Sequence, residues 1–133
     1  MEERSRDGQE VIMRFWEAAE RGDLTSMRAL TADDVMMTWP QSGERFRGRD
    51  NAFAAMGAIE EQHVPAGEPR IVGGGDVWVV MMPMRFGQEA HEYVGVFELR
   101  DGRIAASTEY FAAPFPPSAA RATFSEGERQ QAP

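Results

Sequence analysis

The spacing of apolar residues along the chain changes from a helical pattern to a strand pattern. In the N-terminal part, apolar positions recur one and four residues apart, as on one face of a helix. This pattern predicts a helix over residues 8–21, with its apolar face made by Val11, Ile12, Phe15, Trp16 and Ala19. Gly22 and Asp23 predict the end of this helix and the cap of a short second helix over residues 24–30. A third helix is predicted over about residues 51–63, capped by Asp50.

Runs of strand-forming residues lie on both sides of the third helix. They predict strands over residues 35–39, 45–47, 70–72 and 76–86. Residues 32–34 predict a turn before the first of these strands, and the glycine run at residues 73–75 predicts a bend or bulge before the last. The long last strand has the apolar centre VWVVMM, and a continuously apolar strand indicates that both faces of the sheet are covered.

A hairpin is predicted near the C-terminal end of the chain. Its strands are residues 92–100 and 103–111, and Asp101-Gly102 between them is a strong turn signal because glycine tolerates positive φ. The second strand ends in Glu109-Tyr110-Phe111, which places an acid among mostly apolar neighbours. Helices followed by long antiparallel strands predict an α+β fold.

The length of 133 residues favours one domain with a real core. Residues 1–7 predict a polar, frayed lead, residues 8–115 the domain, and residues 116–133 a loosely held tail. Neither an apolar signal segment nor a run of membrane-spanning length is seen, so we expect a soluble, cytoplasmic protein.

Charge and residue usage exclude several kinds of chemistry. The net charge of −8 argues against nucleic-acid or anionic-membrane partners, because both need basic patches. The chain has no cysteine, so disulfides and thiolate catalysis are excluded. It also has no lysine, which excludes Schiff-base chemistry. The two histidines lie far apart in sequence without a spaced acid pair, so no metal and no cofactor are predicted.

Several stretches of the chain resemble a known superfamily. GVFELRDGRI and EYF resemble the last two strands of the nuclear transport factor 2-like superfamily in its SnoaL-like branch, and FWEAAERGDLTSMRALTADDVMMTWP resembles its opening. The resemblance covers roughly residues 11–115. It implies a cone-shaped, curved antiparallel sheet wrapped around three N-terminal helices, with a pocket between sheet and helices. It also implies a homodimer formed through the outer face of the sheet.

The catalytic sets of the best-known members are incomplete in this chain. Glu109 matches the acid of limonene epoxide hydrolases, but the stretch at residues 78–82, where their arginine and second acid are expected, is apolar. Where ketosteroid isomerases have a tyrosine and two aspartates, this chain has Phe15, Trp39 and, near the last position, Gly95. SnoaL-type cyclases often carry an acid where Ala112 and Ala113 stand.

Glu109 and His63 are the candidate catalytic residues. Burial among apolar side chains would raise the pKa of the Glu109 carboxyl and make it a proton shuttle, whereas a solvated strand end is the alternative. Its candidate hydrogen-bond donors are Trp39, Tyr93, His63 and Arg85. His63 ionises near neutrality and suits a general base, although a histidine at a helix end often faces water.

Large aromatic and thioether side chains predict a pocket for a flat, hydrophobic small molecule, with an ordinary core as the alternative for each. The candidate lining residues are Trp16, Trp39, Met56, Trp78, Met82, Met84, Tyr93 and Phe111. Three functional hypotheses remain open: a proton-transfer enzyme of isomerase, cyclase or hydrolase type, a non-catalytic binding protein for a hydrophobic ligand, and a dimeric interaction module.

Overall fold

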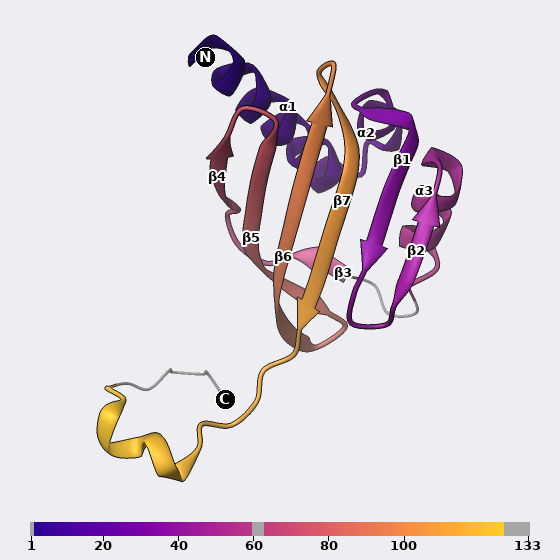
Figure 1. Cartoon of the computed structure of the whole chain (residues 1–133). Helices are drawn as coiled ribbons and strands as arrows, with labels where there is room; N and C mark the ends of the chain where they lie inside the picture. The colour runs from indigo at the N-terminus through magenta and orange to yellow at the C-terminus, as the bar shows by residue number, and fades with distance from the viewer. Residues whose placement is uncertain (1, 60–62, 127–133) are drawn as a thin grey trace.

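The computed structural model describes the backbone of residues 2–59 and 63–126, and the side chains of residues 7–59 and 64–126 (Figure 1). Three helices come first: α1 (Glu2–Arg21), α2 (Leu24–Ala29) and α3 (Arg49–Gly57). The strands are β1 (Thr31–Trp39), β2 (Glu44–Arg47), β3 (His63–Pro65), β4 (Arg70–Gly74), β5 (Val77–Phe86), β6 (Glu89–Arg100) and β7 (Arg103–Ala112). A 3₁₀ helix, η1 (Ala119–Phe124), follows them.

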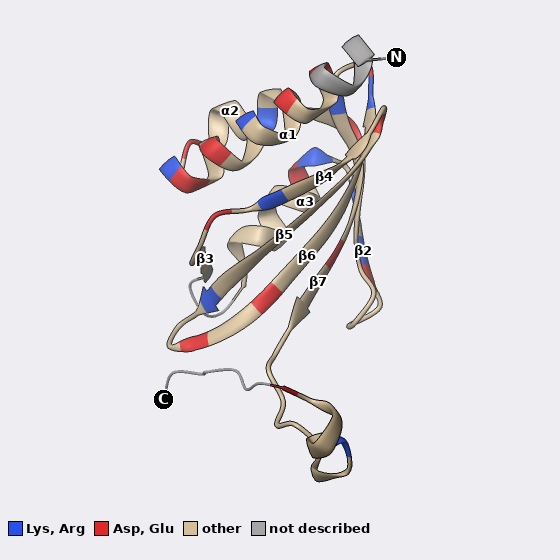
Figure 2. Ribbon diagram, turned by 90° about the vertical axis from the view of Figure 1, so that its left-hand side faces the viewer, with Lys and Arg blue, Asp and Glu red and all other residues tan. Residues whose placement is uncertain are grey.

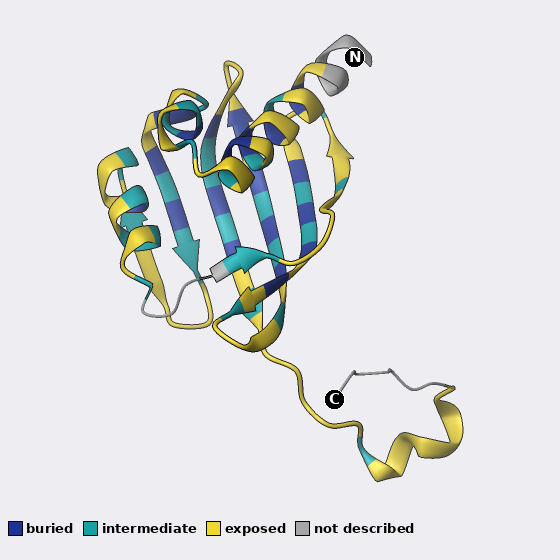
Figure 3. Ribbon diagram, turned by 180° about the vertical axis from the view of Figure 1, so that it is seen from behind, coloured by how far each residue is buried: buried dark blue, intermediate teal, exposed yellow. Residues whose placement is uncertain are grey.

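The strands form one curved, seven-stranded sheet in the order β2-β1-β7-β6-β5-β3, with β4 also paired to β5. All pairs are antiparallel except β1 and β7, which run parallel. The sheet is not closed, and α1 and α2 lie across its concave face while α3 lies beside β1 and β2 (Figures 1 and 3). The α+β class and the curved sheet with N-terminal helices are therefore confirmed.

The core fills the space between the helices and the concave face. Buried and partly exposed positions alternate along β5, β6 and β7, as expected when one face of a strand packs against helices (Figure 3). The largest fully buried side chains are Tyr93, Phe97, Ile12 and Val80. On β5, Trp78, Val80, Met82 and Met84 point inward. Val77, at 49% exposure, and the half-buried Val79 and Met81 lie on the outer face.

The predicted hairpin is confirmed. Arg100 pairs with Arg103, and the two turn residues, Asp101 and Gly102, have φ of 55° and 76°. Positive φ at both central positions is the geometry of a type I′ turn, whose twist matches that of the flanking strands. In the glycine run, by contrast, Gly73 and Gly74 are paired residues of β4, and only Gly75, with Asp76, belongs to the hairpin turn between β4 and β5; the pairing of these strands shows no bulge.

Three predicted boundaries are wrong. The first helix begins at Glu2, so most of the predicted lead is helical. The third helix ends at Gly57, a poor helix former, and His63 instead opens β3, where it pairs with Phe86. Residues 32–34 belong to β1 and form no turn.

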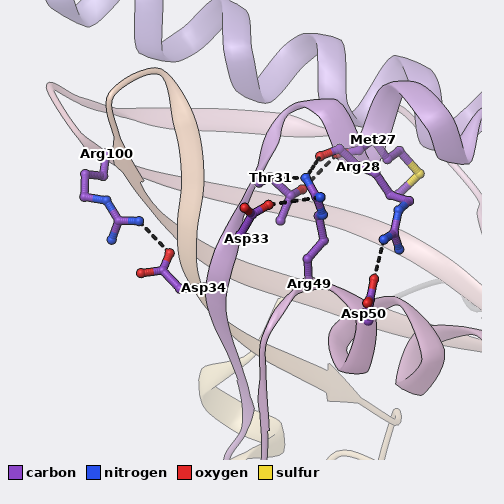
Figure 4. A network of polar contacts seen from close by, with 8 residues as sticks. All are labelled: Met27, Arg28, Thr31, Asp33, Asp34, Arg49, Asp50 and Arg100. Carbon is purple, nitrogen blue, oxygen red and sulfur yellow. Dashed lines mark hydrogen bonds and ion pairs between the residues drawn. The ribbon is translucent and has the colours of Figure 1, made fainter.

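Ion pairs at the junction of α2, β1 and α3 explain why polar residues fit into β1 (Figure 4). The Arg49 guanidinium donates to the carbonyl oxygens of Arg28 and Thr31 at 3.2 and 3.3 Å and pairs with Asp33 at 3.0 Å. Arg28 pairs with Asp50, so Asp50 ties α3 to α2; Gly48, not Asp50, occupies the N-cap position of α3. These contacts hold α2 and α3 in place against β1.

The described part of the C-terminal tail leaves the end of β7 and projects away from the sheet (Figure 1). Its two phenylalanines, Phe115 and Phe124, are 80% and 85% exposed. Among the described helices, none combines the length and apolar character needed to cross a membrane.

Candidate functional site

An inner hollow of about 250 Å³ lies between the helices and the concave face of the sheet. Its lining is almost entirely apolar, with Glu109 and Tyr93 as the titratable side chains among the described residues. It is lined by Phe15, Trp16, Ala19, Gly22, Leu24, Met27, Trp39, Phe53, Met56, Gly57, Ile59, Pro65, Met84, Tyr93, Glu109 and Phe111.

Glu109 lies on β7 with its side chain turned toward the helices. It is only 7% exposed. Its carboxylate accepts a 2.7 Å hydrogen bond from the Tyr93 hydroxyl and a 2.9 Å bond from the indole N–H of Trp39. Both donors are neutral, so among the described residues the carboxylate is oriented without an opposing charge.

Burial raises the pKa of the Glu109 carboxyl above its ordinary value of 4.5, because the ionised form loses hydration. The hydrogen bonds from Tyr93 and Trp39 oppose this shift, since both favour the ionised form. Burial, and then the neighbouring Glu109 charge, raise the pKa of the Tyr93 hydroxyl well above its usual range, so Tyr93 stays a hydrogen-bond donor. The site therefore holds one carboxyl whose proton is unusually easy to retain.

Gly95 makes the contact between Tyr93 and Glu109 sterically feasible. It lies on β6 directly opposite Glu109 and between Tyr93 and Phe97 on the inner face. A Cβ placed on Gly95 would overlap the Tyr93 hydroxyl oxygen and approach Phe97 Cε2 to 2.8 Å. The phenol can reach across to β7 because this position has no side chain.

Aromatic rings surround the acid. The ring of Tyr93 lies 5.4 Å from both the Trp16 and the Phe111 ring centroid, and Phe111 lies 5.6 Å from Trp39. Most of these contacts are edge-to-face or tilted, which is the favoured arrangement of aromatic pairs. The rings make the surroundings of Glu109 on this side of the hollow largely apolar.

A larger outer hollow of about 680 Å³ lies between α1 and the edge formed by β3, β4 and the loop between them. It combines apolar and acidic side chains. It is lined by Gln9, Met13, Trp16, Glu17, Glu20, Pro65, Gly67, Glu68, Pro69, Ile71 and Met82. Trp16 and Pro65 line both hollows.

The indole N–H of Trp16 is buried and has no hydrogen-bond partner among the residues that the structure describes. The other two tryptophans differ: Trp39 donates to Glu109, and Trp78 donates to the Gly75 carbonyl at 2.9 Å. A buried donor without a partner typically costs about 1–3 kcal/mol. Trp16 is thus the tryptophan whose present position is least supported by polar contacts.

The structure brings most of the predicted pocket residues together. The inner hollow gathers Glu109, Trp16, Trp39, Met56, Met84, Tyr93 and Phe111. Met82 lines the outer hollow instead. Trp78 is among the described lining residues of neither hollow and packs in the core. The His63 side chain lies outside the described residues. Arg85 is exposed on β5, and Glu109 is held by Trp39 and Tyr93.

Sequence reasoning missed the positioning role of Gly95, which it noted only as a lost functional group. A small residue between two aromatic residues on one strand face was the available signal. The outer hollow was also missed, because its glutamates are spread over α1 and the loop before β4. Among the described residues, no group of three histidine, aspartate or glutamate side chains is placed to hold a metal ion.

Comparison with solved structures finds close folds with different descriptions. An NTF-2-like protein of unknown function from Burkholderia xenovorans is 28% identical, with a TM-score of 0.79 over 93% of this chain and 97% of that chain. A candidate ketosteroid isomerase from Kribbella flavida is 19% identical, with a TM-score of 0.86 over 96% and 93%. An LEH-like epoxide hydrolase from M. tuberculosis is 20% identical, with a TM-score of 0.65 over 80% and 84%.

No curated protein matches this chain significantly. Residues 12–107, more than half of the chain, match the SnoaL-like domain. The chain belongs to the SnoaL-like domain family and has the nuclear transport factor 2-like fold. Because the fold hosts unrelated chemistries, function has to be argued from the site.

Proposed function

We propose that this protein is a proton-transfer enzyme in which Glu109 moves a proton on a hydrophobic small molecule held in the inner hollow. One observation carries the proposal: the buried Glu109 carboxyl is held by two neutral donors, Tyr93 and Trp39. A buried carboxyl that has only a structural role commonly pairs with a cation, which would keep the carboxyl ionised. Neutral donors orient the group and leave its proton exchangeable.

The electrostatics of the site suit this role. General acid–base catalysis works best when the pKa of the group lies near the working pH, and burial moves the Glu109 pKa in that direction. The hydrogen bonds from Tyr93 and Trp39 keep the ionised form accessible, so the carboxylate can also accept a proton. The apolar lining supplies a water-poor site, in which a substrate carbon acid meets the base without competition from solvent.

Within this class, isomerisation by proton relocation fits the described lining best. The carboxylate takes a proton from one substrate atom as the electron pair moves into the substrate π-system, and the resulting carboxylic acid returns the proton to another atom. This sequence is balanced and needs one acid–base group. Hydrolysis or cyclisation that requires a second acid finds only Tyr93 as a further titratable side chain among the described residues of the inner hollow.

The test measures proton exchange and does not require the natural substrate. A panel of small cyclic ketones and enones is incubated with the protein in heavy water, and deuterium incorporation is followed by mass spectrometry. We expect exchange that Glu109→Gln lowers by about two to four powers of ten, the usual contribution of general acid–base catalysis. Glu98→Gln, an exposed acid on the neighbouring strand β6, is the matched control and should leave the rate unchanged.

Two results would contradict the proposal. Equal exchange by the parent protein and Glu109→Gln would remove Glu109 from the chemistry. Tight binding of panel members without exchange by any of them would instead favour a binding protein with the same pocket.

We also propose that the protein forms a homodimer through the outer face of the sheet. Val72, Val77 and Tyr110 are 39%, 49% and 39% exposed there, next to the half-buried Val79 and Met81. A second copy presenting the same face would cover this apolar surface. Val79→Asp should shift sedimentation from dimer to monomer, whereas Met13→Asp on α1 should not. A parent protein that sediments as a monomer at micromolar concentration would overturn the proposal.

A further inference from the structure

The inner hollow is small for a complete ligand site. Its volume of about 250 Å³ lies below the range of roughly 300–1,000 Å³ that is typical of small-molecule sites. The outer hollow beside it has about 680 Å³ and shares Trp16 and Pro65 with it. A ligand that reaches Glu109 and is larger than one ring system can extend past these two shared residues into the outer hollow.

We infer that the two hollows form one elongated site divided by a movable Trp16, and that its ligand is an amphiphile with an apolar end at Glu109 and a cationic end in the outer hollow. The inference deepens the proposed function and rests on it only for the inner end of the ligand. The outer end and the partition are argued from residues that take no part in proton transfer.

Trp16 is suited to act as a partition because little polar contact holds its ring. Within the described part of the chain its N–H has no hydrogen-bond partner, so rotation of the indole breaks no hydrogen bond there. The ring is held by edge contacts with Phe15, Tyr93 and Phe97, at centroid distances of 5.6, 5.4 and 6.1 Å. A ligand oxygen beside the displaced ring would give this N–H the acceptor that it lacks.

The outer hollow selects against an anionic end. Glu17, Glu20 and Glu68 line it, and none of its described lining residues is basic. Two arginines on α1 have acidic partners of their own: Arg14 pairs with Glu10 at 2.8 Å, and Arg21 pairs with Asp23 at 3.3 Å. Acidic positions on α1 and on the loop leading into β4 can be followed in Figure 2.

The floor of the outer hollow accepts the apolar stem of such a ligand. Met13, Pro69, Ile71 and Met82 contribute apolar surface beside the carboxylates. Met82 and Met84 lie two residues apart on the inner face of β5, one in each hollow. An unbranched chain laid along this face would pass beneath Trp16 from one hollow to the other.

The first experiment compares three esters of equal shape and different charge. Octanoylcholine carries a cationic end, 3,3-dimethylbutyl octanoate is its neutral carbon analogue, and octanoyl isethionate carries a sulfonate. Binding is followed by tryptophan fluorescence and by calorimetry below the micellar concentration. We expect the cation to bind roughly tenfold more tightly than the sulfonate, the sum of several exposed ion-pair contributions, with a difference that shrinks as salt is added.

Variants assign this preference to the outer hollow. Replacing Glu17, Glu20 and Glu68 together by glutamine should abolish the preference for the cation while leaving the affinity for the neutral ester unchanged. The control replaces Glu44, Glu89 and Glu92 by glutamine; these exposed acids make the same change in net charge but line neither hollow. The control protein should keep the preference.

Trp16→Ala tests the partition. It should speed association of octanoylcholine and weaken binding of cyclohexanol, a probe small enough for the inner hollow alone, because the two hollows merge. Trp16→Phe keeps an aromatic side chain at this position but removes the N–H and the five-membered ring of the indole, so it should slow neither probe.

The results separate this inference from the proposed function. Equal affinity for the three charges, no binding of any ester, or loss of octanoylcholine binding in Trp16→Ala would overturn the two-hollow site. None of these results would touch deuterium exchange at Glu109 with small ketones. Conversely, if Glu109 proved to take no part in deuterium exchange, a charge preference measured in the outer hollow would remain valid.

Discussion

Two groups of carboxylates in this molecule are held in opposite ways. Asp34 and Asp50 lie at the surface and pair with Arg100 and Arg28 (Figure 4). Glu109 lies in the inner hollow, where its donors among the described residues are the neutral side chains of Tyr93 and Trp39. The hydrogen bonds and charges of the arginines lower the pKa of both aspartates. Burial raises the pKa of Glu109.

The difference separates structural from reactive acids. A surface carboxylate beside an arginine is fixed as an anion over the whole neutral range, so it holds elements together and exchanges no proton. A buried carboxyl beside a phenol and an indole keeps both protonation states within reach. The nature of the partner, more than the presence of an acid, decides which role a carboxylate can take.

The largest effect on the difference between these carboxylates is expected when the space at Gly95, opposite Glu109, is filled. Gly95→Ala should push the Tyr93 hydroxyl away from Glu109 and destabilise the protein by about 3 kcal/mol, the upper part of the usual range for overpacking. The Glu109 pKa should rise further, because the bond from Tyr93 favours the ionised form. Urea unfolding and carbon-13 NMR of the glutamate carboxyls, with Glu109→Gln for assignment, measure the two effects.

Gly57→Ala is the control for this substitution: Gly57 also lines the inner hollow, but no atom of the described residues lies within 4 Å of a Cβ placed there. It should leave the Glu109 pKa unchanged. An unchanged Glu109 titration in a folded Gly95→Ala protein would show that Gly95 does not position Tyr93.

Tyr93→Phe should have the next largest effect. It removes one of the two donors to a buried acceptor and should destabilise the protein by about 1–2 kcal/mol. The Glu109 pKa should rise in the same direction as in Gly95→Ala. In the double variant the two pKa shifts should not add, because both act through the same hydrogen bond; additive shifts in the NMR titration would contradict the shared cause.

The raised Glu109 pKa also predicts how stability depends on pH. The folded-state pKa lies above the unfolded one, so the contribution of Glu109 to stability is full below the unfolded pKa and is lost as the pH rises through the folded pKa. The loss amounts to about 1.4 kcal/mol for each unit by which the pKa is raised. The free energy of unfolding of Glu109→Gln should lack this decline. Parallel pH profiles of the two proteins would contradict the raised pKa.

Much of the fold could be predicted from the sequence because local signals there agree. The Asp101-Gly102 turn, the apolar face of α1 and the Asp23 cap, which accepts a 3.1 Å bond from the Ser26 amide, all act within a few residues. The Asp33-Asp34 segment misled the prediction, because its place in β1 depends on Arg49 and Arg100 from distant segments. Such partners cannot be read from local pattern.

The direction of the Glu109 side chain shows a similar limit at the site. If the side chains of β7 alternated strictly between the two faces of the sheet from the turn onward, Glu109 would lie on the face opposite to Ile104. The register between β6 and β7 shifts after the pair Leu99–Ile104, and Ala105 is the extra residue. One extra residue reverses the face of every later side chain, so Glu109 turns inward opposite Gly95. Nothing in the local sequence announces this bulge.

The smallest effect is expected from a substitution of a surface carboxylate that is paired with an arginine. Asp34→Asn removes the ion pair with Arg100. The Arg100 side chain is 54% exposed and the Asp34 side chain is 68% exposed. Because Arg100 lowers the Asp34 pKa, the contribution of this pair is present above the unfolded pKa and is lost as the pH falls through the folded pKa, opposite to Glu109. The stability difference from the parent protein should therefore vanish in acid and shrink in high salt. The Glu109 carboxyl signal should titrate unchanged in Asp34→Asn; a shifted titration would mean that the surface pairs and the buried acid are coupled after all.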